Sequence, residues 1–203
     1  MLTIAIVSQK GGAGKSTLSA SLAAYCATNG VKTAVIDLDP QASLSTWHGL
    51  RKAQDIELRP CHPPQVSRTV DQLAAQGFEL CIIDTPPHSS TAAANAISAA
   101  TLTIVPVRPS AFDLVGVQAT FDLIAQHKGK AGAILTAVPS GSNVEVAAAE
   151  FIDGSGVEVV GRTGHRIAFQ HSINAGLGVT ELAASSPAAK EITALWKSIR
   201  KMQ

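Results

Sequence analysis

At 203 residues, 46% of them hydrophobic, the chain can bury a sizeable core, and we expect one globular domain over residues 1–203. A formal net charge of +1 excludes bulk electrostatic attraction to nucleic acid or to an anionic membrane. No segment approaches the roughly 20 apolar residues of a membrane span. A signal peptide is not expected, because the first apolar run is short and leads directly into a glycine loop. The three cysteines lack metal-ligand spacing and cannot all pair, which favours a reducing cytoplasm.

The first pattern along the chain is an apolar run, Leu2 to Val7, followed by a glycine loop and a helix that Asn29-Gly30 would close. The loop reads Ser8-Gln9-Lys10-Gly11-Gly12-Ala13-Gly14-Lys15-Ser16-Thr17. Glycines let the backbone N–H groups of such a loop point inward, and the N-terminus of the following helix favours an anion. The order of strand, glycine loop and helix therefore predicts a phosphate-binding loop.

Within this loop, Lys15 is expected to contact the β- and γ-phosphates of a nucleotide, and the Ser16 hydroxyl to ligate Mg²⁺. The full P-loop pattern has a glycine where this chain has Gln9. A tight turn that binds nothing is a poor alternative, because two lysines beside three glycines would repel each other without an anion between them. The expected nucleotide contacts are Lys10, Gly11, Gly12, Ala13, Gly14, Lys15, Ser16 and Thr17.

The second apolar strand begins at Lys32 and ends in two acids, Asp37 and Asp39, just before Pro40. A strand, a helix and a second strand form a right-handed unit with parallel strands. The glycine loop and the two acids should therefore meet at the carboxyl edge of the sheet. Taken alone, such acids often do no more than start a turn, but beside a phosphate loop they are candidates for the metal and hydrolysis site.

Further on, Ala42 to Ala53 is predicted to be helical, Ile56 to Arg59 to be a short strand, and Pro63 to Gln76 to be another helix. The stretch from Phe78 then repeats the pattern of an apolar strand that ends in an aspartate, here Asp84. An aspartate in this place is typical of the Walker B strand, where it holds the Mg²⁺ shell opposite the loop hydroxyl.

The remainder of the chain alternates between predicted helices and strands. They are helix Ser90 to Ala100, strand Leu102 to Val107, helix Phe112 to His127, strand Gly132 to Val138, helix Asn143 to Ile152, strand Val157 to Val160, two short helical stretches beyond Gly161, and a final helix from Pro187. This alternation predicts an α/β fold, a doubly wound, mainly parallel sheet with helices on both faces.

The loop from Lys10 to Ser16, with its two lysines, resembles the deviant Walker A motif of the ParA/MinD ATPase family of P-loop NTPases. Other stretches look like the aspartate segment, the Walker B strand and the partition-ATPase loop of that family, and they are Val35 to Gln41, Ile82 to Pro87 and Ile104 to Asp113. The length is similar to that of the short ParA proteins that segregate plasmids.

This resemblance implies an ATPase with ATP and Mg²⁺ as cofactors. In the family, the lysine matching Lys10 reaches across a homodimer interface to the partner's nucleotide, and the aspartate matching Asp39 positions the attacking water. Together with Lys15, these are the expected catalytic residues. The expected residues of the metal shell are Ser16, Asp37 and Asp84. The implied cycle has an ATP-bound dimer on nonspecific double-stranded DNA of the nucleoid, released when a centromere-binding adaptor protein stimulates hydrolysis.

Basic residues gather at the C-terminal end, where six basic residues follow Val159 against two acidic ones. We expect part of this set to form a DNA surface that becomes continuous in the dimer. The candidates are Arg162, Arg166, Lys197, Arg200 and Lys201. The alternative is that these charges are scattered and solvated.

Two other functions stay open. One is a MinD-like positioning ATPase that acts at a membrane or on a protein cargo, and the other is a P-loop ligase or kinase, against which Lys10 speaks. A membrane partner is not expected, because the apolar stripe of the final helix is predicted to cover the sheet. That stripe consists of Ile192, Leu195, Trp196, Ile199 and Met202.

Overall fold

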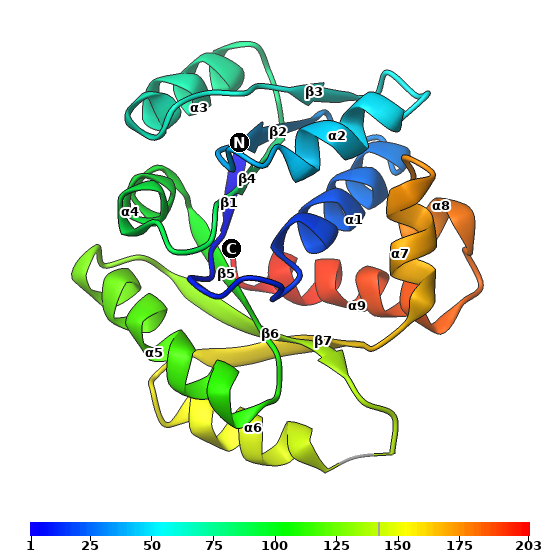
Figure 1. Ribbon diagram of the computed structural model, residues 1–203. Helices are drawn as coiled ribbons and strands as arrows, with labels where there is room; N and C mark the ends of the chain where they lie inside the picture. Colours follow the sequence, from blue (N-terminus) through cyan, green and yellow to red (C-terminus); the bar gives the residue numbers. More distant parts are fainter. Residues whose placement is uncertain (142) are drawn as a thin grey trace.

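Seven strands form one sheet, in the order β3-β2-β4-β1-β5-β6-β7, in the computed structural model, which describes residues 1–141 and 143–203 (Figure 1). The strands are β1 (Leu2–Ile6), β2 (Thr33–Asp37), β3 (Ile56–Leu58), β4 (Leu80–Asp84), β5 (Leu102–Val107), β6 (Ala131–Val138) and β7 (Glu158–Gly164). Neighbouring strands all pair in parallel, because each returns through a helical crossover. The predicted doubly wound parallel sheet is confirmed.

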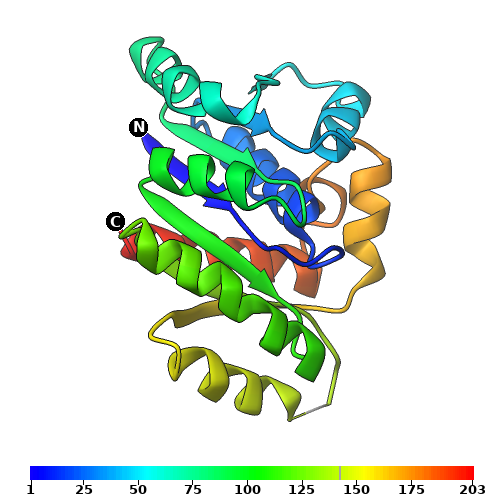
Figure 2. The same ribbon diagram turned by 60° about the vertical axis from the view of Figure 1, so that its left-hand side comes forward.

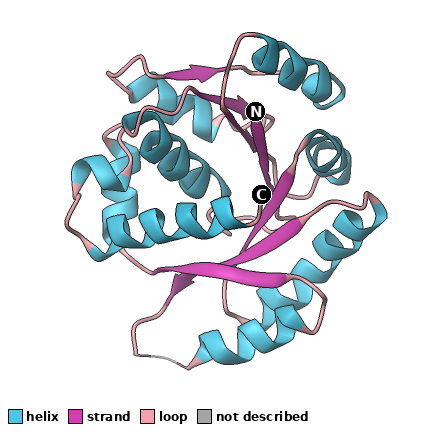
Figure 3. Ribbon diagram, turned by 180° about the vertical axis from the view of Figure 1, so that it is seen from behind, coloured by secondary structure: helices cyan, strands magenta, loops and turns pink. Residues whose placement is uncertain are grey.

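Helices cover both faces of this sheet, as the view from behind also shows (Figure 3). One face carries α1 (Lys15–Thr28), α2 (Ser43–Leu50), α7 (Ile167–Asn174), α8 (Val179–Leu182) and α9 (Pro187–Lys201). The other carries the short turn η1 (Pro63–Gln65), α3 (Val66–Ala75), α4 (Ser90–Ala99), α5 (Ala111–Gln126) and α6 (Val144–Asp153). The fold therefore has three layers.

The two cores follow from the alternation of side chains along each strand. In β1, Ile4 and Ile6 join the core under α1 and α9, while Ala5 joins the core under α4 and α5. Both faces of a parallel sheet are covered, so its strands are apolar throughout. Because all strands are parallel, they end at the same edge, where the loop between β1 and α1 lies, and the arrowheads visible in Figure 2 point toward it.

The final helix packs as predicted. Ile192, Leu195 and Ile199 of α9 are buried against the sheet, and Trp196 and Met202 pack beside them. Within the described residues, none of the helices combines the length and the apolar character needed to cross a membrane.

Three predicted boundaries differ from the structure by three residues or more. The helix predicted over Ala42 to Ala53 ends at Leu50, because Arg51 adopts an extended backbone. The helix predicted from Pro63 begins with the turn η1 before α3. Strand β7 continues to Gly164 rather than ending at Val160. Gly161, which the sequence suggested as a strand end, lies within β7. The position needs a glycine because Leu195 occupies the space that a β-carbon would need.

Candidate functional site

The loop between β1 and α1 curls at the N-terminus of α1. Gly12 and Gly14 have φ values of +73° and +88°, a region that only glycine adopts without strain. Gly14 is the N-cap of α1, and no side chain caps the helix there. The first N–H groups of α1 therefore face the loop without a side-chain partner, which is the arrangement that binds an anion.

Lys15 folds back over this loop. Its Nζ donates a hydrogen bond to the Lys10 carbonyl oxygen at 3.2 Å, and the residue is only 7% exposed. Burial lowers the pKa of Lys15, while Asp84 and Asp39 act in the opposite direction. A phosphate beside this partly desolvated cation would be strongly favoured.

A cavity of about 320 Å³ opens over the loop and gathers several of the predicted residues. It is lined by Gly11, Gly12, Gly14, Lys15, Ser16, Thr17, Asp39, Ser43, Trp47, Pro87 and Ile173. The structure thus brings Lys15, Ser16 and Asp39 around one space. Four segments far apart in the sequence contribute to it. Three of them follow β1, β2 and β4, because parallel strands deliver their following loops to the same edge, and the fourth is α7.

Asp84 lies at the end of β4, fully buried behind this cavity. The Ser19 hydroxyl donates to its Oδ1 at 3.0 Å, whereas Oδ2 has no hydrogen-bond partner among the described residues. Burial raises the pKa of Asp84 to about 7, and neighbouring Asp37 adds to this rise, while the hydroxyls of Ser16 and Ser19 oppose it. An orphaned carboxylate oxygen near the loop hydroxyl fits a Mg²⁺ shell, so Ser16 and Asp84 suit the ion.

Asp37, the last residue of β2, bonds to the segment that carries Asp39 and to the start of α2. Its Oδ1 accepts a hydrogen bond from the Asp39 N–H at 3.1 Å, and its Oδ2 accepts from the N–H and hydroxyl of Ser45 at 2.8 and 2.7 Å. Asp37 therefore anchors the first turn of α2. Its predicted place in the metal shell stays a prediction. No group of three or more acidic, histidine or cysteine side chains is poised for a metal in residues 1–141 and 143–203.

Lys10 lies outside the cavity. Its aliphatic stem crosses α5 at Gly116, where a β-carbon would collide with the Lys10 Cε. Asp113 and Arg108 lie around the same small pocket as Lys10. Within one subunit, the Lys10 side chain thus lies apart from the cavity, against a glycine of helix α5 that leaves room for it.

Residues 4–179 match the family model of the CobQ/CobB/MinD/ParA nucleotide binding domain. The chain belongs to this MinD/ParA family.

The chromosome-partitioning ATPase Soj of Thermus thermophilus is 32% identical to the chain over an alignment of 143 residues, and the match covers 56% of this chain and 57% of Soj. The chain thus matches less than two thirds of that relative's length. Among solved structures, apo McdA of Cyanothece superposes with a TM-score of 0.86 at 18% identity, covering 98% of this chain and 99% of McdA. MinD of Pyrococcus horikoshii, complexed with Mg-ADP, gives 0.83 at 19% identity, covering 99% and 96%. These two similarities show the shared fold.

One support of the loop in this MinD/ParA chain was not predicted. The buried Thr136 hydroxyl donates to the Ala13 carbonyl oxygen at 2.9 Å. A register shift in β6 between Leu135 and Val138, with Ala137 at φ +52°, turns the strand here. Because bulges carry no reliable sequence signal, Thr136 could be placed beside the loop only by position along the chain.

Gln9, the departure from the full P-loop pattern, is held by its backbone. Its N–H donates to the Thr120 hydroxyl at 3.4 Å, and its carbonyl oxygen accepts from the His88 N–H at 3.1 Å. These contacts tie the start of the loop to α5 and to the segment after β4. His88 has φ +55° and an exposed side chain, so it acts on the loop through its backbone.

The predicted DNA residues do not form one free basic surface in a single subunit. Arg162 pairs with Glu145, and Arg166 pairs with Glu191 at 2.6 Å. The other three are exposed on α9, and they are Lys197, Arg200 and Lys201. The ion pairs arise between residues 17 and 25 positions apart, so the count of charges in the sequence could not show them.

The packing of Lys10 against Gly116 leads to a prediction. Gly116→Ala should stabilise helix α5 by roughly 1 kcal/mol through helix propensity, and the new β-carbon should displace the Lys10 side chain. We expect Lys10 to be acylated several-fold faster in this variant, measured by peptide mass spectrometry after a brief lysine-reagent pulse. The control is Gly49→Ala, a glycine in α2 with open space around it. Equal labelling of Lys10 in parent and Gly116→Ala would contradict this packing.

Asp84 gives a prediction on pH. Its pKa is about 7 when folded, against an ordinary value of 3.8, so the folded state binds the proton more tightly. Between these pH values, rising pH destabilises the nucleotide-free protein. Asp84→Asn should therefore raise the free energy of unfolding by about 3 kcal/mol more at pH 8 than at pH 4.5, measured with urea. Asp71→Asn, exposed on α3, is the control. A gain independent of pH would refute the raised pKa.

Proposed function

We propose that the protein is a Mg²⁺-dependent ATPase that dimerises around ATP and partitions DNA. The observation that carries this proposal is the convergence of Lys15, Ser16 and Asp39 on one cavity, with the buried carboxylate of Asp84 behind it. Hydrolysis of a phosphoanhydride requires charge neutralisation and an oriented water more than covalent help. These residue types in this arrangement match that requirement.

In this proposal, the free N–H groups at the start of α1 and the Lys15 ammonium hold the β- and γ-phosphates. Ser16 and Asp84 would hold Mg²⁺, which when bound neutralises charge on the phosphate oxygens. Asp39, in the wall of the cavity, orients the attacking water. Its Oδ1 accepts a hydrogen bond from the Gln41 N–H at 2.9 Å, which holds the carboxylate in that wall.

The nucleoside of ATP is proposed to occupy a second cavity of about 170 Å³ on the other side of the loop. Gly12 and Gly14 line both this cavity and the phosphate cavity. Ala13, Thr136 and Phe169 also line the second cavity. The cavity connects the loop to the ends of β6 and β7. An open sheet commonly binds nucleotides in this place, beyond the carboxyl ends of its strands.

Dimerisation is proposed to use the side of the molecule where Lys10 lies. Phe112 and Val115, at the start of α5, are 85% and 73% exposed. Large exposed apolar side chains on one helix face are typical of a protein interface. The Lys10 side chain crosses the same helix. In this proposal, a second subunit that docks there moves Lys10 away from Gly116 and toward the phosphates bound by the partner subunit.

DNA and an adaptor are the proposed partners, by analogy with the partition role named for Soj. Within the DNA surface, Lys197, Arg200 and Lys201 are the stronger candidates, because Arg162 and Arg166 are already paired with glutamates. The second candidate function is MinD-like positioning of another cargo, and the fold similarity to McdA and MinD favours it.

Retention experiments separate these functions. With ATP, the parent should bind random-sequence duplex and not anionic liposomes, and with ADP it should bind neither. A Lys197/Arg200/Lys201 triple alanine variant should bind DNA more weakly and with a shallower salt dependence, by about 0.9 in slope for each lost phosphate contact. Arg162→Ala, which removes a paired charge, should lose much less. Equal DNA affinity with ATP and ADP, or retention on liposomes alone, would overturn the partition proposal.

A further inference from the structure

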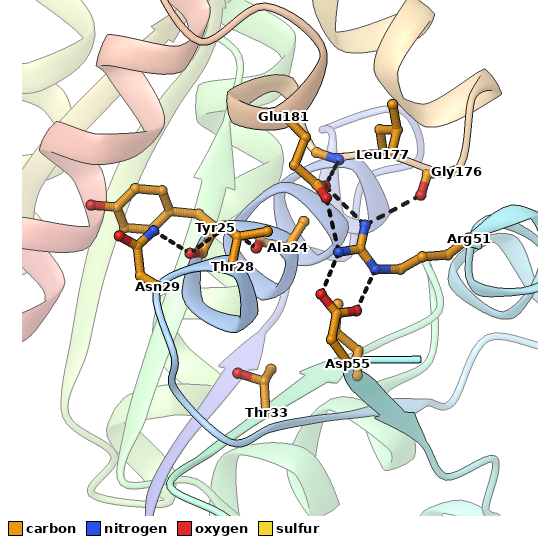
Figure 4. A network of polar contacts seen from close by, with 12 residues as sticks. Ala24, Tyr25, Thr28, Asn29, Thr33, Arg51, Asp55, Gly176, Leu177 and Glu181 are labelled. Atoms are coloured by element: carbon orange, nitrogen blue, oxygen red, sulfur yellow. Dashed lines mark hydrogen bonds and ion pairs between the residues drawn. The ribbon is translucent and has the colours of Figure 1, made fainter. Parts of the chain in front are cut away.

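A buried guanidinium joins the end of α2 to helix α8 and to the segment just before it (Figure 4). The Arg51 side chain is 0% exposed. Its Nε and Nη2 donate to the two carboxylate oxygens of Asp55, both at 2.7 Å. Its Nη1 and Nη2 donate to the two oxygens of Glu181 at 2.8 and 3.0 Å. We call Arg51, Asp55 and Glu181 the Arg51 cluster.

The Arg51 cluster also fixes the backbone that it touches. Arg51 Nη1 donates to the Gly176 carbonyl oxygen at 3.4 Å, and Glu181 Oε2 accepts from the Gly178 N–H at 2.7 Å. Gly176, at φ +68°, approaches the backbone of Leu50 and Arg51 so closely that no β-carbon would fit. The end of α2 and residues 176–178 therefore form one closely packed unit.

This unit continues to the phosphate cavity through Trp47. The Trp47 Nε1 donates to the Leu177 carbonyl oxygen at 3.2 Å, and its ring lies 5.6 Å from the Arg51 guanidinium. Trp47 and Ile173 of α7 line the cavity beside Asp39. The Arg51 cluster thus lies directly behind the wall that faces the phosphate loop.

Helix α2 is therefore held at both ends. Its first turn is bound to Asp37 through the N–H and hydroxyl of Ser45, and its last residue precedes the Arg51 cluster. The segment that carries Asp39 runs between β2 and this helix. A shift of α2 at its C-terminal end would therefore move Trp47, and with it the end of the Asp39 segment that joins α2.

Stability alone does not account for the Arg51 cluster. Burying a guanidinium is costly, and apolar side chains of similar volume often stabilise a fold as well or better. What an apolar core cannot supply is the fixed geometry of a planar fork that bonds two carboxylates and a carbonyl at once. The Arg51 cluster therefore fixes the position of the end of α2 relative to residues 176–181.

We propose that Arg51 is a positioning residue for the phosphate site, which holds the end of α2 against residues 176–181 so that Trp47 and Asp39 keep their places in the cavity wall. The proposal rests on the ATPase function proposed above. Displacement of a water-orienting group by about 1 Å can cost a hundredfold in rate. Loss of the fork should therefore lower kcat more than it changes KM.

The test uses Arg51→Lys, which keeps the charge and loses the fork, and measures hydrolysis and the emission of Trp47 in a Trp196→Phe background. We expect folded protein, a loss of at least about tenfold in kcat with a smaller change in KM, and a weakened response of Trp47 to ADP. The matched control is Arg59→Lys, whose ion pair with Glu57 is exposed and does not belong to the Arg51 cluster. It should behave as the parent.

Asp55→Asn is the second variant, should Arg51→Lys fail to fold. It retains the pair between Arg51 and Glu181 and should give a smaller loss in the same direction. If a folded variant keeps both the kcat of the parent and the parent's Trp47 response to ADP, the positioning role of Arg51 is wrong. A parent protein that does not hydrolyse ATP would instead refute the proposed function, and the Trp47 response to ADP would still test the Arg51 cluster.

Discussion

Lys15→Ala should lower the affinity for Mg-ATP by roughly two to three orders of magnitude. The ammonium is held over the loop, partly desolvated, and its removal leaves buried phosphate charge unpaired. Isothermal titration calorimetry measures the loss directly. Circular dichroism should show an unchanged fold. Burial of the Lys15 ammonium costs desolvation energy in the nucleotide-free protein, so its removal should not destabilise the folded state.

The matched control for this variant is Lys10→Ala, which removes the other lysine of the same loop. Lys10 lies along α5, outside the cavity, so a single subunit should bind Mg-ATP with nearly the parent's affinity without it. If the two variants lost affinity equally, the loop would not distinguish its lysines in the way this geometry requires.

Asp39→Ala should bind ATP and dimerise, yet hydrolyse it at least about a hundredfold more slowly. Asp39 lies in the cavity wall, where it can orient a water without being needed for phosphate contacts. Size-exclusion chromatography with ATP should show a persistent dimer, and phosphate release should be nearly abolished. Lys10→Ala should show the reverse, with ATP bound and no dimer.

The opposite behaviour of the two variants would contradict the roles of Asp39 and Lys10. A monomeric Asp39→Ala protein beside a dimeric Lys10→Ala protein would reverse the roles given to the water-orienting acid and the interface lysine. Asp37→Asn is an informative companion, because Asp37 binds Ser45 and the Asp39 backbone. It should weaken hydrolysis by loosening α2 rather than by removing a group from the cavity.

Those parts of the fold and site that depend on local patterns could be predicted from the sequence. The glycine loop followed by α1 and the strand that ends at Asp84 each combine a short apolar run with its functional residue. Parallel topology then requires these ends to meet at one edge. Lys15, Ser16 and Asp39 were placed together on that reasoning alone.

Contacts between distant segments could not be predicted in this way. Thr136 reaches the loop through a bulge, and Arg162 and Arg166 each meet a glutamate from another element. The capping of α2 by Asp37 and the burial of Arg51 depend on how α2 packs against its neighbours. Residue type and spacing carry no information on such packing.

The ATPase site is best tested by the release of phosphate from ATP by the parent, with Mg²⁺ and with excess chelator, beside Lys15→Ala and Asp39→Ala. We expect steady release by the parent with Mg²⁺, almost none with chelator, and almost none from either variant. Release that is unaffected by both substitutions would mean that the cavity around Lys15, Ser16 and Asp39 is not where ATP is hydrolysed.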